Sequence, residues 1–120
     1  QRSEVYAQVA LLRRPPAMSR EHYLSYWMLH HTPIAIRTQN VSAYVQNIVL
    51  EPLTDASPEI AGIVEEHFPM EALQDPNAFY GSRDAADLAR RMTELLDSVA
   101  QFGAGENLDL VPTSRYSWAL

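Results

Sequence analysis

The stretch VYAQVALL at residues 5–12, followed by SREHYLSYWMLHH at residues 19–31, decides the predicted fold. The first run is almost continuously apolar and rich in β-branched residues, which predicts a strand covered on both faces. Two consecutive prolines end that strand, and Ser19 is then a typical helix N-cap. The sequence therefore predicts a strand followed by a helix that extends to about His31.

One side of this helix carries large side chains. Tyr23, Trp27 and His31 are spaced at i, i+4 and i+8, which places them on one face of a helix. Pro33 disfavours the helical conformation at Thr32, so a break or kink is predicted at that point.

In the rest of the chain, the apolar residues are spaced either as in strands or as in helices. The predicted elements are strands at 41–50, 62–68 and 108–120, a helical turn at 70–74, and a helix that is capped by Ser82 or Asp84 and ends near Gln101. The order strand, helix, strand, strand, helix, strand is the split β-α-β arrangement of ferredoxin-like domains. We therefore expect a single α+β domain over residues 1–120, with a four-stranded antiparallel sheet and two helices on one face.

The second face of such a sheet needs a cover, and the chain has no spare element for it. A second copy is the simplest cover, so a homodimer is expected. Tyr116, Trp118 and Leu120 are large apolar residues that we interpret as a dimer contact. The alternative is that they pack within their own sheet.

Composition excludes several classes of function. Nine basic against 15 acidic residues give a net charge of −6, and all nine basic residues are arginines, which argues against nucleic acid as a partner. Cysteine is absent, which removes disulfides, thiolate metal sites and cysteine nucleophiles. No stretch approaches the ~20 apolar residues of a membrane span, and the first residues do not resemble a signal peptide. We therefore expect a cytoplasmic protein without a membrane partner.

His31 is the first candidate for chemistry. An imidazole titrates near neutral pH and can serve as a general acid or base. The alternative is a core histidine that is satisfied by a backbone carbonyl.

The second candidate is the acidic segment of the strand at 62–68. Glu65 and His67 share one face of this strand, separated by about 6.5–7 Å along it, and Glu66 points to the other face. Acidic residues interrupt an otherwise apolar strand here, and such interruptions are typical of functional sites. The alternative is a half-exposed strand with a solvated polar face.

Tyrosines and metal ligands give weaker signals. A buried phenol can donate a hydrogen bond to an enolate oxygen, but most tyrosines are packing residues. The four histidines and neighbouring carboxylates show no metal-ligand spacing, so no metal site is predicted. The sequence also has no glycine-rich phosphate loop and no serine nucleophile elbow, and four histidines leave haem ligation open.

Five ordered motifs of this chain resemble the EthD family. They are LLRRP (11–15), MSREHYLSYW (18–27), HTPIA (31–35), YVQN (44–47) and GIVEEHF (62–68). The family pattern has S-x-E-x-F/Y-x-x-Y-W, then H-x-P-L-A four residues after the Trp, and later Y-x-Q-N and D-G-I-A-E-x-x-F. The match covers about the first two-thirds of the chain. The sequence differs from the family at Ala61, where Asp is frequent, and at Glu66-His67, where apolar or aromatic residues are usual.

This resemblance implies a dimeric α+β barrel, in which two ferredoxin-like protomers pack sheet to sheet. Relatives with this fold include cofactor-free cyclases, lactone isomerases and monooxygenases, dye-type peroxidases and accessory proteins of cytochrome systems, so the fold does not fix the reaction. The pocket of cofactor-free relatives lies between sheet and helices, where His and Tyr transfer protons. The family positions carried over to this sequence are Tyr23, Tyr26, Trp27, His31, Pro33, Tyr44 and Glu65.

Together these observations predict a lyase, isomerase or cyclase that uses no organic cofactor and acts on a small, aromatic or polyphenolic metabolite. The candidate catalytic residues are His31 and His67 as acid–base groups, Glu65 or Glu66 as the carboxylate, and Tyr26 or Tyr44 as the oxyanion donor. The candidate substrate-binding residues are Tyr23, Trp27, Phe68 and Tyr80. The alternatives are a non-catalytic protein of EthD type that binds a metabolite or assists an oxygenase, and a haem protein with peroxidase-like chemistry.

Overall fold

The structure is a computed structural model and describes residues 2–119. Its strands are β1 (Arg2–Leu12), β2 (Ala43–Ile48), β3 (Gly62–Pro69) and β4 (Asp109–Tyr116). Its helices are α1 (Arg20–Tyr26), α2 (Thr32–Thr38), α3 (Pro76–Tyr80) and α4 (Ala85–Gln101). A π-helical turn (Trp27–His31) joins α1 to α2, and a 3₁₀ turn (Met70–Leu73) follows β3.

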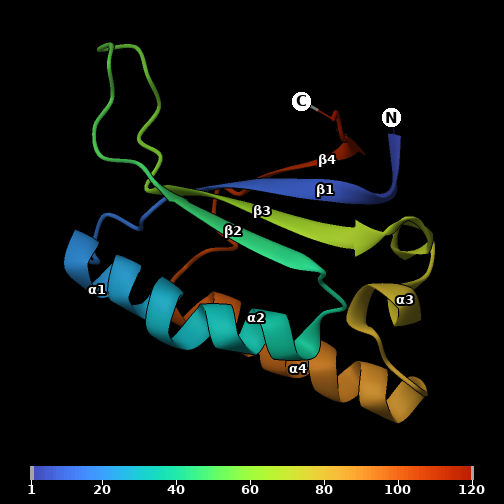
Figure 1. The fold of residues 1–120 in the computed structure, drawn as a ribbon. Coiled ribbons are helices and arrows are strands. Elements are labelled where there is room, and N and C mark those ends of the chain that lie inside the picture. Colours follow the sequence, from blue (N-terminus) through green and yellow to red (C-terminus); the bar gives the residue numbers. More distant parts are fainter. Residues whose placement is uncertain (1, 120) are drawn as a thin grey trace.

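The four strands form one antiparallel sheet in the order β2-β3-β1-β4. The helices cover one face of this sheet and leave the other face open (Figure 1). The predicted α+β class and split β-α-β order are therefore confirmed.

Strand β3 shows the predicted alternation. Val64, Glu66 and Phe68 are buried under the helices, whereas Glu65 and His67 are only partly buried on the opposite, open face. Adjacent side chains of a strand point to opposite faces of a sheet, so Glu65 and Glu66 serve different surfaces.

The first helix continues past Pro33, where a break or kink was expected. Thr32 directs both its backbone N–H and its Oγ1 to the carbonyl oxygen of Trp27, and Oγ1 lies 2.7 Å from it. Pro33 then occupies the first turn of α2, where a helix has no need of its missing N–H. The wider π turn thus accommodates the proline, and helical structure continues to Thr38 (Figure 1).

Helix α4 begins after Asp84, one of its two predicted N-caps, and buries polar as well as apolar side chains. The buried positions are Asp87, Leu95 and Ser98, whereas Leu96 is 55% exposed. Two polar residues are buried here because each has a hydrogen-bonding partner inside the protein.

The chain end leaves large apolar groups exposed. Tyr116 is 57% and Trp118 is 78% exposed, so neither packs fully within its own sheet. Leu120, the third residue of the predicted dimer contact, lies outside the described residues. Within residues 2–119, no helix is long and apolar enough to cross a membrane.

Candidate active site

A cavity of about 300 Å³ lies between the sheet and the helices. Its walls come from all four strands, the helical run around the π turn, α3, α4 and the segment that leads into β4. Most of the lining is apolar or aromatic. The polar side chains that reach it are Gln8, His31, Gln39, Tyr44, Glu66 and Tyr80. Such an apolar cavity with a few convergent polar groups is typical of a small-molecule site.

A row of polar side chains forms the sheet wall of this cavity. In the strand register, Glu66 is the direct partner of Gln8 on β1 and of Tyr44 on β2. Directly opposed residues of antiparallel strands have Cβ atoms about 4.5–5.5 Å apart, so these three side chains are neighbours on the inner face.

Glu66 is the only buried acidic residue of this row. Its side chain is 8% exposed, and burial raises its pKa to about 7. With its amide nitrogen oriented toward acceptors, Gln39 donates to Oε2 of Glu66 at 2.6 Å. Near neutral pH this carboxyl group exists in both protonation states, as a general acid or base requires.

His31 projects into the cavity from the helix side. His31 is the last residue of the π turn, and Phe102 packs against its ring with ring centroids 4.8 Å apart. Its Nδ1 lies 2.8 Å from Oγ of Ser98 on α4. Burial lowers the pKa of His31 to about 4, so the imidazole is neutral at pH 7.

Tyr44 completes the polar part of the cavity. Its hydroxyl oxygen accepts a hydrogen bond from Nε1 of Trp27 at 3.1 Å, and Thr32 Oγ1 lies 3.4 Å away. Burial raises the pKa of Tyr44, which keeps the phenol protonated and able to donate.

The structure separates Glu65 and His67 from this cavity. They lie on the open face of the sheet, where Nε2 of His67 is 2.7 Å from Oε1 of Glu65. Their predicted proximity is confirmed, but the sheet lies between them and His31. Any role of this pair would belong to the open face.

The remaining candidates occupy different environments. Trp27 and Tyr80 line the cavity. Phe68 is fully buried in a second cluster, between Tyr6 and Phe79. Tyr26 lies behind His31, with its hydroxyl 3.3 Å from Oγ of Ser98.

Tyr23 is fully buried in the core cluster that also contains Trp27. Among the described residues, its hydroxyl is the one buried side-chain oxygen or nitrogen without a hydrogen-bond partner. Burial, with a smaller contribution from Tyr44, raises its pKa to about 12.

Sequence reasoning missed three polar residues of the site. Gln8 had a signal, because it lies two residues from Tyr6 and from Ala10 on β1 and therefore shares their inward face. Ser98 had no such signal, because the residues one and two turns before it on the helix, Glu94 and Arg91, are polar as well. Gln39 had none, since the helix that positions it was not predicted.

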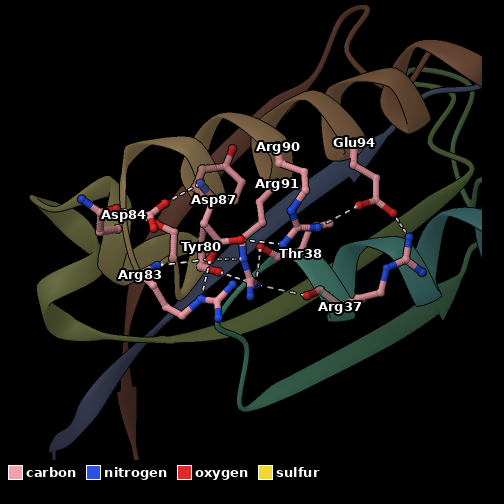
Figure 2. A network of polar contacts seen from close by, with 11 residues as sticks. Arg37, Thr38, Tyr80, Arg83, Asp84, Asp87, Arg90, Arg91 and Glu94 are labelled. Atoms are coloured by element: carbon pink, nitrogen blue, oxygen red, sulfur yellow. Dashed lines mark hydrogen bonds and ion pairs between the residues drawn. The ribbon is translucent and has the colours of Figure 1, made fainter.

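A network of ion pairs stabilises one end of the site (Figure 2). Asp87 on α4 is buried and accepts from Arg90 and Arg91, and Arg83 also lies beside it. The Arg90 guanidinium contributes most to holding the pKa of Asp87 at about 2. The Asp87 carboxylate is therefore charged at every pH near neutrality.

Arg91 connects this network to the cavity walls. Its Nη1 donates to the backbone carbonyls of Arg37, Thr38 and Tyr80, at the ends of α2 and α3 (Figure 2). Gln39 follows directly after α2, and Tyr80 lines the cavity. The network therefore positions both residues, including the partner of Glu66.

No group of three or more metal-ligating side chains occurs between residues 2 and 119. The cavity residues themselves can supply proton transfer by Glu66 and hydrogen bonding by His31 and Tyr44.

Solved structures with the same fold were found. An EthD family protein of Bacillus halodurans has a TM-score of 0.58 and 14% identity, and the match covers 93% of this chain and 99% of that one. A protein of Arabidopsis thaliana has a TM-score of 0.55 and 11% identity, with 96% and 99% covered. A hydroxynitrile lyase of Passiflora edulis has a TM-score of 0.53 and 13% identity, with 98% of each chain covered.

No protein-family model matches the sequence, and no curated protein matches it. The structural likenesses extend over almost the full length of each chain, but their sequence identities are low, so they establish the fold alone. This chain has the α+β fold of EthD-family proteins.

Proposed function

We propose that this protein is a small-molecule enzyme of lyase or isomerase type. In its cavity, Glu66 transfers a proton, and Tyr44 and His31 bind an oxygen atom of the substrate. The observation that carries this proposal is a buried carboxyl group in an apolar cavity, held by Gln39 and directly opposite Tyr44 in the strand register.

Glu66 suits proton transfer better than His31. A catalytic acid or base works best when its pKa lies near the working pH, and burial brings the pKa of Glu66 to about 7. Burial moves the pKa of His31 away from that range, to about 4. We therefore assign the proton transfer to Glu66 and substrate binding to His31.

The walls favour an apolar, aromatic substrate. Trp27, Phe79, Tyr80 and Phe102 all reach the cavity, and flat aromatic ligands pack well against such rings. A volume of about 300 Å³ suits a compact metabolite. The hydroxynitrile lyase with the same fold supports testing C–C bond cleavage as well as isomerisation.

Two probe reactions test the proposal, and neither requires that the natural substrate be identified first. In one, small aromatic ketones are incubated with protein in D₂O, and loss of the hydrogen next to the carbonyl is followed by NMR. In the other, an aromatic cyanohydrin is supplied. There the base takes the hydroxyl proton, the carbon–cyanide bond breaks, an aldehyde forms, and cyanide leaves as HCN.

We expect protein-dependent turnover of at least one probe and a loss of at least about 100-fold in Glu66→Gln, the usual scale of general acid–base catalysis. Glu65→Gln is the matched control, because it removes the neighbouring carboxylate on the opposite face. Equal activity of wild type and Glu66→Gln would refute the role of Glu66. Tight binding of the probes without turnover would favour a metabolite-binding or accessory protein instead.

We also propose that the protein is a homodimer that pairs the open faces of two sheets. Val45, Glu65, Val9 and Val111 form one row across that face. No helix covers this face (Figure 1), and Val111 at its edge is 50% exposed.

Light scattering is expected to give twice the chain mass. Val111→Asp should dissociate the dimer, whereas Leu29→Asp on the exposed helix surface should not. A wild-type monomer at micromolar concentration would refute the assembly.

A further inference from the structure

Three side chains form a hydrogen-bonded chain behind the cavity. The hydroxyl of Tyr26 on α1 lies 3.3 Å from Oγ of Ser98 on α4, and this Oγ lies 2.8 Å from Nδ1 of His31. Ser98 is 3% exposed, so water does not compete for its hydroxyl. Nε2 of His31 has no hydrogen-bond partner among the described residues, and His31 lines the cavity. One ring nitrogen is therefore bound from behind, and the other is available to a ligand.

We propose that Tyr26 and Ser98 fix His31 as the neutral tautomer with its proton on Nε2, so that the cavity presents a hydrogen-bond donor to a carbonyl or enolate oxygen. The tautomer follows from the hydroxyl chain alone, whereas the role toward a substrate oxygen rests on the proposed function.

The direction of the hydrogen bonds follows from acid and base strength. Ser98 has one hydroxyl proton, so it donates either to Nδ1 or to the oxygen of Tyr26, but not to both. A phenol is a stronger acid than an aliphatic alcohol and hence the better donor, and an imidazole nitrogen is a better acceptor than a phenol oxygen. The favoured order is Tyr26 to Ser98 to Nδ1, which leaves Nδ1 without a proton. Since a neutral imidazole carries one proton, that proton is on Nε2.

The position of Ser98 supports this role. A serine inside a helix commonly bonds the carbonyl oxygen four residues earlier, but this hydroxyl points away from its own helix to His31 and Tyr26. An apolar residue could occupy the buried position of Ser98 in α4 as well as a serine does. A hydroxyl there is accounted for by its two partners.

Two walls of the cavity would then act on different atoms of one substrate. The Glu66 carboxylate takes a proton from the carbon next to a carbonyl, and the C–H electron pair moves toward the oxygen as an enolate. Nε2–H of His31 donates to that oxygen. In a substrate with a further carbon–carbon double bond next to that carbon, the enolate extends into a dienolate. Glu66 then returns the proton to the far carbon and the double bond moves into conjugation with the carbonyl, so the isomerisation is balanced and His31 keeps its proton throughout.

The test is ¹⁵N NMR of the imidazoles in the labelled full chain, where long-range ¹H–¹⁵N correlations distinguish a protonated ring nitrogen from a bare one. The His31 signals are assigned by their loss in His31→Gln. Between about pH 6 and 8 we expect a protonated Nε2 and a bare Nδ1. A protonated Nδ1 would overturn the proposal.

Three variants test Tyr26 and Ser98 as positioning residues. Ser98→Ala and Tyr26→Phe should each convert the single tautomer into a mixture, and Ser98→Thr, which keeps a hydroxyl, should preserve it. Thr93→Ala removes an exposed hydroxyl from the same helix and should change nothing. A folded Ser98→Ala protein with an unchanged tautomer would refute the role of Ser98. The wild-type spectrum tests the proposal even if a variant fails to fold.

A ligand titration separates this inference from the proposed function. Acetophenone is added to wild type and to His31→Gln, and we expect a shift of the Nε2 resonance on binding to wild type. If the tautomer is as proposed but acetophenone binds without moving that resonance, the role of His31 toward a carbonyl oxygen is refuted, whereas the tautomer assignment stands.

Discussion

Replacing Glu66 by glutamine should stabilise the protein at high pH. Glutamine has the shape of a protonated glutamate and cannot ionise. Burial raises the pKa of Glu66 from 4.5 to about 7 in the folded chain. Between these values the unfolded chain has lost this proton while the folded chain keeps it, so stability falls as the pH rises.

The size of the effect follows from the same numbers. Each tenfold change in acid strength corresponds to ~1.4 kcal/mol, so the change from 4.5 to about 7 corresponds to about 3 kcal/mol. Gln39 donates a hydrogen bond that stabilises the charged carboxylate and reduces this difference. We therefore expect Glu66→Gln to be more stable than wild type by about 1–3 kcal/mol above pH 7, with no difference below about pH 4.5.

Urea unfolding of both proteins between about pH 4 and 8.5 measures this difference directly. Glu65→Gln is again the control, because it changes the neighbouring carboxylate on the opposite face of β3, and it should not reproduce the gain in stability at high pH. Parallel stability curves for wild type and Glu66→Gln across the whole range would refute the burial argument. The catalytic assignment would then lose its physical basis as well.

Three further substitutions test the packing around the site. Gly62→Ala should cost about 1–3 kcal/mol in urea unfolding, because a Cβ would lie 2.4 Å from Cζ3 of Trp27; a neutral outcome would show that the indole can move aside. Tyr23→Phe should keep or raise stability by up to ~1 kcal/mol, because it removes a buried hydroxyl without a partner; a loss of more than ~1 kcal/mol would reveal an ordered water there. Asp87→Asn should lower the melting temperature at pH 7, and the difference should vanish as the pH falls through about 2, where Asp87 itself becomes protonated; identical melting curves at pH 7 would show that the arginines do not stabilise the fold through it.

Much of the fold was predictable because alternation and helix caps are local properties. The two faces of β3 and the N-cap at Asp84 depend on residues close in sequence. The continuation of the helix through Pro33 was not predictable in the same way. It depends on Thr32, whose hydroxyl and N–H both meet the Trp27 carbonyl in a wider turn. The rule that disfavours helix before proline does not include that arrangement.

The site was predictable only in part. His31, Tyr44 and Glu66 were found because each residue type carries recognisable chemistry, and all three line one cavity. The sequence could not choose between Glu65 and Glu66, since alternation separates their faces without saying which face the helices cover. That choice is made by how β1 and β3 pair and by the side of the sheet on which the helices pack.

Charge is distributed unequally between the cavity and the network beside it. Burial moves His31 and Glu66 of the cavity toward their neutral forms. Between about pH 4 and 7, His31 has lost its proton and Glu66 mostly keeps its own, as their pKa values of about 4 and about 7 require. At the ends of α2 and α3, by contrast, Asp87 stays charged because arginines surround it. A permanently charged cluster can hold helices in place, since its ions are paired and do not respond to small changes in pH. A cavity that binds an apolar substrate is better served by neutral groups, one of which ionises near pH 7. This separation is why the carboxylate that stabilises the fold and the carboxyl group that we assign to the chemistry are different residues on different elements.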